Sequence, residues 1–426
     1  MKIQGKKRAW FWVPTAYFAE GGPYMAVSTV SAILFKSLGM EDRYVALWTS
    51  LMMLPWSIKP LWAPFVDMFR TKRQWILATQ LVMALLFTAM AGLIVEESLS
   101  LILIGVFFLL AFVSATHDVA VDGFYLIALD KHGQAFFAGI RGTFYRIASV
   151  SVQGGLVMLA GLVERWNGDL RLGWALSLVC AAGVMFVIFL WHGFALPRPA
   201  EDGPVENGGF LSDFLESFLS FFRMKGILWI LLFLFFFRLA EAQLGKIAAL
   251  FLQSGAEDGG LGLSLEAIGT LYGTVGPVAL IAGGILGGVI VASCGFAKCI
   301  WPLVCAINLP DIVYVFLAVE RPASLWAVGG CIAVEQFGYG LGYTAILLVM
   351  VALAENSGRY KTSHFAIMTG VTILGMMLVG GISGYAAELL GYAGFFWYVM
   401  ACTIPSFLVT VPVVRLIPAD FGGKSA

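Results

Sequence analysis

The chain has 426 residues, of which 60% are hydrophobic and only 12% charged, and its mean hydropathy is +0.89. Soluble globular chains are about 45–50% apolar and about 25% charged. This composition therefore excludes an ordinary soluble domain and predicts a polytopic membrane protein. The formal net charge is zero, although the basic residues are distributed very unevenly between the loops.

The cysteines and histidines indicate no metal site. Six cysteines are scattered through apolar segments or at their edges, no two of them have metal-ligand spacing, and the chain has only four histidines. We expect packing roles for the cysteines, and neither a metal nor another cofactor. The basic residues 1–8 lead directly into an apolar span, without a small-residue cleavage site, so no cleavable signal peptide is predicted.

Apolar segments long enough to cross a bilayer, which takes roughly 20 residues, recur along the whole chain. Twelve spans are predicted, at about 10–37, 45–66, 74–95, 99–128, 134–163, 172–193, 227–253, 265–293, 297–319, 323–354, 362–390 and 392–416. The predicted fold class is an all-α membrane protein with two pseudo-symmetric six-helix bundles.

The central connection differs from the other loops. It begins with LPRPAEDGPVENGG, which is rich in Pro, Gly and acidic residues and is typical of a linker. The following FLSDFLESFLSFFRMKG is amphipathic and predicts an interfacial helix. The predicted domains are an N-terminal bundle at 1–193, a cytoplasmic linker with this helix at 194–226, and a C-terminal bundle at 227–426.

The loop charges predict the orientation. Lysines and arginines concentrate in the loops on the side of the N-terminus, and cytoplasmic loops carry such an excess. Both termini are therefore expected in the cytoplasm, as an even number of spans requires. We expect a multi-pass protein of the bacterial inner membrane, in contact with lipid.

The two halves resemble copies of one repeat. Tyr-Phe-Ala-Glu-Gly surrounds Glu20 in the first span, and Arg-Leu-Ala-Glu-Ala surrounds Glu241 in the seventh. Acidic residues also occur within spans four and ten, where Glu335 lies in the tenth. Parallel six-helix repeats with a substrate site between them are a known transporter design.

The most informative span is the fourth, which carries His117, Asp118 and Asp122 in an apolar stretch. Ionisable groups at such depth cost at least about 2.5 kcal/mol each, so they are rare without a function. An i,i+4 spacing places both aspartates on one helix face, and two close carboxylates resist ionising together. These three residues are the predicted proton-coupling site. Two alternatives remain open, a structural ion-pair network with span five and a neutral, hydrogen-bonded histidine.

Other charged residues within the spans are candidates for binding substrate. Arg146 is deep enough in span five to bind a carboxylate or phosphate, whereas Arg141 lies nearer the cytoplasmic end and could also snorkel. Arg238 and Glu241 could contact substrate or pair with each other at i,i+3. The predicted substrate-binding set is Glu20, Arg141, Tyr145, Arg146, Arg238, Glu241 and Glu335.

Charges near the cytoplasmic end of span two predict a gate. Asp67, Arg70, Lys72 and Arg73 follow the span, and Lys59 precedes a proline within it. We interpret this cluster as gating charges and not as a substrate site.

Three stretches carry a family resemblance: KPLWAPFVDMFRTKRQWILATQ, SATHDVAVDGFY, and KTSHFAIMTGVTILG followed by GYAGFFWYV. Together they resemble major facilitator superfamily transporters of the AmpG-like type. Asp118 and Asp122 match the family's two aspartates four apart, whereas His117 stands where the family has glutamine. The resemblance implies a muropeptide permease or a relative among acetyl-CoA and siderophore carriers.

The function predicted from the residues and the resemblance together is transport, not catalysis. We expect proton-coupled import of a bulky anionic organic solute, foremost peptidoglycan fragments (anhydro-muropeptides), by alternating access. The alternative is a carrier of a siderophore or acyl-CoA-type solute, with export as an open direction. The expected partners are this small-molecule substrate, protons and lipid but no nucleic acid, and the expected state is a monomer. No ATP-binding loop or nucleophile–base motif supports an enzyme.

Overall fold

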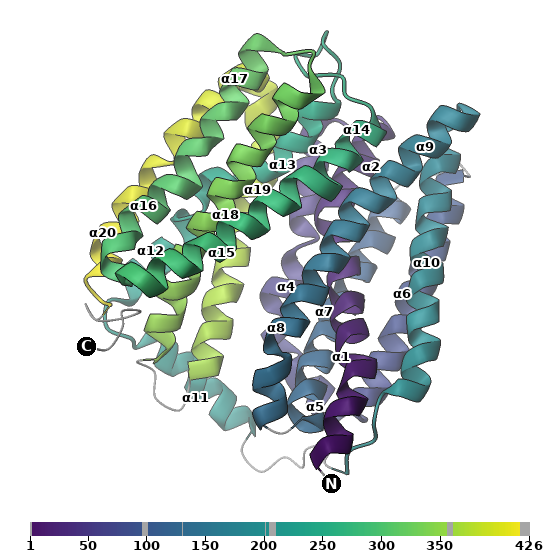
Figure 1. Ribbon diagram of the computed structural model, residues 1–426, viewed down its shortest axis with the longest axis vertical. Helices are drawn as coiled ribbons and strands as arrows, with labels where there is room; N and C mark the ends of the chain where they lie inside the picture. The colour runs from purple at the N-terminus through teal and green to yellow at the C-terminus, as the bar shows by residue number, and fades with distance from the viewer. Residues whose placement is uncertain are drawn as a thin grey trace. The chain divides into compact units, whose positions relative to one another are not determined.

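The structure is a computed structural model, which describes residues 2–95, 101–129, 131–200, 202–203, 210–355 and 361–417. All regular structure within these ranges is helical (Figure 1). The chain forms two compact units, one made of Met1–Gly39 and Ile58–Gly208, the other of Met40–Ser57 and Gly209–Ala426.

The first unit contains long helices joined by short π- or 3-10-helical turns, which are labelled η. Its elements are α1 (Lys2–Met25), η1 (Ala26–Val30), α2 (Ser31–Ser37), η2 (Lys59–Leu61), α5 (Ala63–Met68), α6 (Lys72–Val95), α7 (Leu101–Ala128), α8 (Lys131–Val150), η3 (Ser151–Leu156), α9 (Val157–Asn167) and α10 (Leu170–Ala195).

The second unit contains the remaining elements. They are α3 (Asp42–Leu51), α4 (Leu54–Ile58), α11 (Phe210–Phe222), α12 (Ile227–Phe236), α13 (Leu239–Gln253), α14 (Leu265–Thr270), η4 (Leu271–Val275), α15 (Gly276–Cys294), α16 (Phe296–Asn308), η5 (Leu309–Asp311), α17 (Ile312–Glu320), α18 (Leu325–Glu355), α19 (Lys361–Cys402) and α20 (Ile404–Val414). The last residue of α4, Ile58, already belongs to the first unit.

The predicted spans coincide with helical segments. Among the described residues, nine segments are long and apolar enough to cross a membrane. One of them, His364–Val414, has 51 residues and is interrupted at Gly391, whose φ is 64° and ψ 165°. It covers predicted spans eleven and twelve. The first two predicted spans fall on interrupted helices within 2–37 and 42–68. The all-α class is confirmed, and twelve crossings are consistent with these segments.

The predicted domain boundaries differ from the two units at one place. The predicted N-terminal bundle runs continuously over 1–193, whereas Met40–Ser57 groups with the second unit. The reason is a close backbone contact. A Cβ added to Gly384 of α19 would lie 2.4 Å from the Cα of Arg43 in α3. The side chain of Arg43 also pairs with Glu388 at 3.1 Å.

Glycines allow equally close packing between α15 and α18. A Cβ on Gly340 would lie 2.1 Å from the carbonyl oxygen of Leu280, and one on Gly283 would lie 2.1 Å from the carbonyl oxygen of Phe337. Small residues at helix contacts are the usual way in which membrane helices approach. The glycine-rich composition of spans eight and ten therefore has a packing explanation at these positions.

Two prolines lie beside π-helical turns. Pro23 of α1 precedes η1 by three residues, and Pro277 follows η4 in the first turn of α15. A proline lacks the backbone N–H that a helix would donate four residues back. Each of these two helical segments thus departs from regular α-helix where the sequence removes a hydrogen bond.

A buried polar chain crosses the first unit. The Gln80 side chain lies 3.0 Å from His117 Nε2 and 2.8 Å from His192 Nδ1, and His192 Nε2 lies 2.8 Å from Thr15 Oγ1. Gln80, His117 and His192 are fully buried. Buried polar groups are costly without partners. These hydrogen-bonded side chains therefore fix how α1, α6, α7 and α10 pack against one another.

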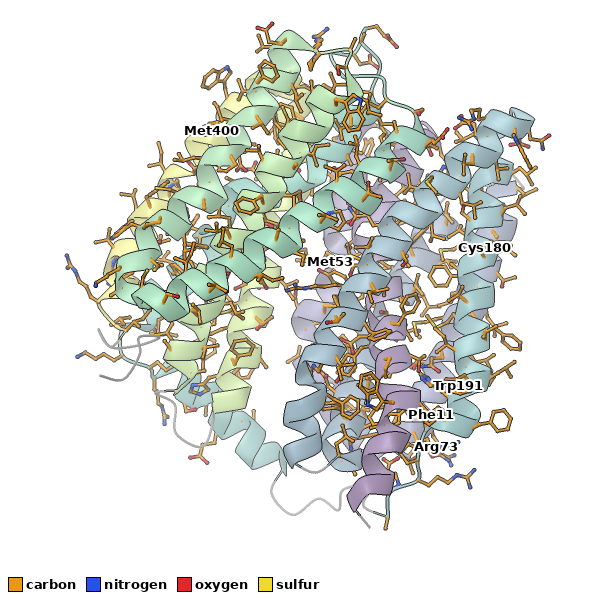
Figure 2. The ribbon with its side chains drawn as sticks, in the orientation of Figure 1. Phe11, Met53, Arg73, Cys180, Trp191 and Met400 are labelled. Atoms are coloured by element: carbon orange, nitrogen blue, oxygen red, sulfur yellow. The ribbon has the colours of Figure 1, made fainter. Side chains whose placement is uncertain are left out.

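The start of the central connection is attached to the first unit. The Asp202 carboxylate accepts hydrogen bonds from the backbone N–H groups of Lys72 and Arg73, at 2.7 and 3.1 Å. Arg73 in turn donates to the carbonyl oxygen of Gly193 at 2.7 Å, and Figure 2 labels it near Trp191. Asp202 therefore caps the N-terminus of α6. Helix α11 forms where the amphipathic helix was predicted; its location at a membrane interface remains a prediction.

The glycine contacts generate a stability test. Gly340→Ala should destabilise the protein by about 1–3 kcal/mol, because the new methyl group meets a backbone oxygen that cannot move away easily. Gly330→Ala in the same helix is the control, because no atom lies within 4 Å of its Cβ position. Thermal unfolding of the detergent-purified variants measures both. Equal midpoints for the two variants would contradict the packing explanation.

Candidate functional site

Three carboxylic acids form a cluster within the first unit, which we call the acidic cluster: Glu20 of α1 and Asp118 and Asp122 of α7. The i,i+4 spacing of the aspartates places both on one face of α7, as predicted. Asp118 is 7% exposed. Glu20, predicted to bind substrate, belongs to the same cluster as the predicted proton-coupling residues.

A lysine from the interrupted second span balances one of these acids. The Lys59 ammonium forms an ion pair with the Asp118 carboxylate. Lys59 lies in η2, the short 3-10 turn between α4 and α5, so the break in this span brings its side chain to α7. We predicted Lys59 to be a gating charge; the structure places it on the acidic cluster.

An arginine and two tyrosines surround Asp122. Its Oδ1 accepts a hydrogen bond from the Tyr17 hydroxyl at 2.9 Å and lies 3.4 Å from Arg141 Nη1. The Arg141 guanidinium also lies over the rings of Tyr17 and Tyr125, at 4.8 and 5.3 Å from their centroids. Such cation–π contacts hold a guanidinium in place. Ion pairing of this aspartate with span five, one of the open alternatives, is therefore present.

Glu20 lies close enough to Asp118 and Asp122 for the charges of the three carboxyl groups to interact. Its Oε2 atom is buried and has no hydrogen-bond partner among the described residues. Two ionised carboxylates have no donor between them. A hydrogen bond between these groups therefore requires that one of them carries a proton.

The charge count leads to the same result. The acidic cluster has three carboxyl groups, and the two cations that contact it are Lys59 and Arg141. With all groups ionised, the cluster would carry one net negative charge next to the buried Asp118, which is unfavourable, while Asp122 and Arg141 are partly exposed. One bound proton makes the cluster neutral.

His117, the third predicted proton-coupling residue, faces the polar chain of Gln80 and His192. Its Nδ1 has no hydrogen-bond partner among the described residues. The contact with Gln80 matches the alternative of a hydrogen-bonded histidine. A role for His117 in proton coupling remains a prediction.

The second unit contains a comparable arrangement around an arginine. Arg238 donates to both carboxylate oxygens of Glu241, each at 2.5 Å, and to the Tyr339 hydroxyl at 2.9 Å. Its guanidinium also lies 5.2 Å from the Tyr343 ring centroid. The predicted i,i+3 pairing is thus present, and it occupies both side chains. Substrate contact by either residue remains a prediction.

The other predicted substrate residues lie in different surroundings. Arg146 is exposed. The Tyr145 ring lies 6.3 Å from that of Tyr24. Glu335 is buried and accepts a hydrogen bond from Gln336 at 2.9 Å.

The predicted gating residues do not form one cluster of side chains in the described part. Arg70 is exposed and adopts a left-handed backbone conformation with φ of 66°. Lys72 is buried, with its side chain against Gly123 of α7, and Arg73 binds the end of α10. The side chain of Asp67 lies outside the described residues.

Several polar residues were missed in the sequence. Asp311 is buried, and its Oδ2 has no hydrogen-bond partner among the described residues. It is the only acid in the predicted span 297–319, so it could have been singled out from the sequence. Gln80 and His192 could have been singled out in the same way, because they are polar residues within predicted spans.

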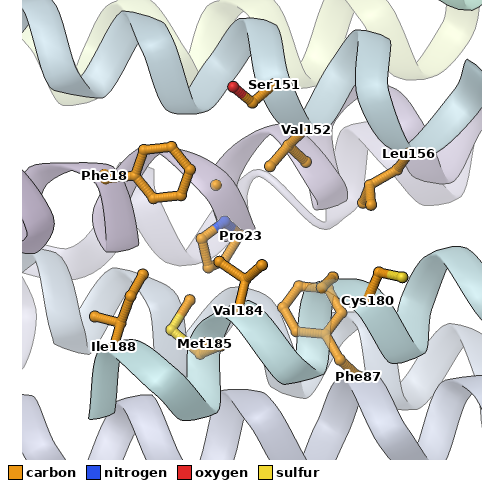
Figure 3. Close-up of a pocket in the computed structure, with 12 residues that line it drawn as sticks. Phe18, Pro23, Phe87, Ser151, Val152, Leu156, Cys180, Val184, Met185 and Ile188 are labelled. Atoms are coloured by element: carbon orange, nitrogen blue, oxygen red, sulfur yellow. The ribbon is translucent and has the colours of Figure 1, made fainter. Parts of the chain in front are cut away.

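A separate cavity of about 130 Å³ lies in the first unit. Figure 3 shows that apolar side chains line most of it, including Phe18, Phe87 and Met185. None of the acidic cluster lines this cavity. The charged residues, and not this cavity, therefore define the candidate site.

Comparisons with known proteins agree with the predicted resemblance. Residues 21–135 match the model of the BT1 family; this stretch includes two of the three motif stretches. The chain is 24% identical to the putative transporter AmpG 4 of Rickettsia conorii, over 92% of each chain. It is 23% identical to the anhydromuropeptide permease of Escherichia coli K12, over 91% of this chain and 74% of that protein.

Solved structures show the fold. The nucleoside transporter NupG superposes with a TM-score of 0.68 over 97% of this chain and all of the other, at 12% sequence identity. The chain therefore has the fold of major facilitator superfamily transporters, and its sequence is similar to AmpG-like permeases.

Proposed function

We propose that this protein is a proton-coupled secondary transporter that imports a bulky anionic organic solute, foremost peptidoglycan fragments, by alternating access. The similarity to a permease named for anhydro-muropeptides supports the substrate class. The concentration of basic residues in the loops on the N-terminal side supports placement in the bacterial inner membrane with both termini in the cytoplasm.

The observation that carries the proposal is the acidic cluster with its two cations. A site that is neutral with one proton bound, and carries a net negative charge without it, responds to protonation by changing its interactions. The Glu20–Asp118 carboxyl pair is where the proton binds. Glu20 thereby acts in proton coupling and not in substrate binding.

Release of the proton changes the balance around Lys59. The ammonium then faces two carboxylates, Glu20 and Asp118, which compete for it. Such an exchange of partners favours a different arrangement of α1, η2 and α7, and a shift between two arrangements is what alternating access requires.

The driving force is sufficient for accumulation of solute. Each pH unit supplies about 1.36 kcal/mol per proton, and 100 mV of membrane potential supplies about 2.3 kcal/mol per charge. One proton moved together with a solute of one negative charge carries no net charge, so the pH term alone drives accumulation, about tenfold per pH unit. The membrane potential contributes only when more protons than solute charges are moved.

Removing the proton-binding group should separate exchange from accumulation. Glu20→Gln keeps the size of the side chain but cannot bind and release a proton. We expect it to abolish uptake of labelled anhydro-muropeptide driven by an inward proton gradient in proteoliposomes. Exchange of labelled for unlabelled solute across the same vesicles should continue, because reorientation with bound solute needs no net proton transfer.

The control for that experiment is Glu320→Gln, which changes an exposed acid at the end of α17. It should accumulate solute like the wild type, and a pH-sensitive dye inside the vesicles should report solute-dependent acidification. Gradient-driven accumulation by Glu20→Gln at the wild-type rate would refute the assignment of the proton site.

The charge balance also makes a prediction for stability. Lys59→Met alone should destabilise the protein by about 3–5 kcal/mol, because it leaves a buried carboxylate without its cation. Adding Asp118→Asn should restore much of the loss, since both members of the pair are then neutral. Thermal unfolding in detergent measures Lys59→Met, Asp118→Asn and the double variant. Additive losses in the double variant would show that the two side chains do not depend on each other.

A further inference from the structure

The second unit contains a lysine that lacks the acidic partner found at Lys59, Arg141 and Arg238. Lys246 lies in α13, and the only hydrogen bond found for it among the described residues joins its ammonium to Thr49 Oγ1 of α3, at 3.3 Å. By contrast, Lys59, Arg141 and Arg238 each pair with a carboxylate.

The neutral partner leaves the charge of Lys246 uncompensated. The Thr49 hydroxyl already donates to the Val45 carbonyl oxygen at 2.8 Å, so it can only accept from the ammonium. Two of the three N–H donors of the ammonium are therefore left without a hydrogen-bond partner among the described residues. A charged group within a span is costly unless another charge or water meets it. Lys246 is half-buried, so an incoming group can still reach it.

A second donor without a partner lies beside this lysine. The Ser50 hydroxyl is buried and has no hydrogen-bond partner among the described residues. A Cβ added to Gly380 of α19 would lie 3.1 Å from Ser50 Oγ and 3.2 Å from Lys246 Cγ. The Ala242 carbonyl oxygen lies 3.1 Å from the same position. The stem of Lys246 is therefore packed closely between Ser50 of α3 and Gly380 of α19.

We propose that Lys246 binds a carboxylate of the transported solute. An ammonium donates hydrogen bonds, and a carboxylate accepts several. The same charge repels a proton or a metal ion, so the site selects an anion. This inference rests on the proposed function, because it assigns the group that recognises the solute's negative charge.

The test compares two forms of one solute. Proteoliposomes containing the full chain take up labelled anhydro-muropeptide, either with its free peptide carboxylates or with those carboxylates converted to amides. Wild-type protein should prefer the free acid. Lys246→Gln should raise the KM for the free acid about tenfold or more, the effect expected for losing a hydrogen bond between charged groups. It should leave the KM for the amide nearly unchanged.

Two further variants distinguish charge from structure. Lys246→Arg keeps the positive charge and should retain the preference for the free acid. Lys298→Gln removes an exposed lysine at the start of α16 and should behave like the wild type. A Lys246→Gln protein with the wild-type preference would overturn the inference. Should that variant fail to fold, Lys246→Met takes its place, with a raised KM for the free acid alone as the expected result.

A binding measurement separates failure of this inference from failure of the proposed function. Thermal unfolding in detergent is followed with both muropeptide forms and with citrate as a simple carboxylate. If the wild type transports neither muropeptide form, the proposed substrate is wrong. The inference then still requires that a carboxylate compound stabilises the wild type more than Lys246→Gln. Equal stabilisation of both proteins by every compound would refute it.

Discussion

The arrangement of the first unit depends on the cost of uncompensated charge away from water. Three carboxyl groups share two cations in a region that is buried at Asp118 and partly exposed at Asp122 and Arg141. Lys59 is placed by the break in its span and pairs with Asp118, whereas Arg141 pairs with Asp122 and lies over two tyrosine rings. Under the proposed function, the number of bound protons is the quantity that changes.

Each of the two units contains an arginine in similar surroundings. Arg141 and Arg238 each pair with a carboxylate and each lie against two tyrosine rings. This likeness agrees with the duplication that the sequence predicts from Glu20 and Glu241, although the partners differ. In the first unit the carboxylate comes from another helix, whereas in the second it lies three residues along the same chain. The second arginine is therefore neutralised locally.

Helix positions could be predicted from the sequence because long apolar stretches have few alternatives in a membrane. The two aspartates predicted to couple protons could be singled out for the same reason, since charged residues are rare in an apolar segment. The pairing of charged side chains between helices could not be predicted, because it depends on which helix faces lie against each other. Lys59 was assigned to a gate by its neighbours in sequence, yet its ammonium pairs with Asp118. Asp202, in a segment predicted to be a linker, caps α6.

Lys59 lies directly after the point where the chain passes from the second unit to the first. Ser57 is the last residue of the segment that groups with the second unit, and Ile58 returns to the first. The ion pair of the acidic cluster therefore attaches the chain immediately after the crossover between the units. A change in the charge on Asp118 therefore reaches Lys59, two residues after this crossover, through a single ion pair. Under the proposed function, protonation would act on this part of the chain without a long series of intermediate contacts.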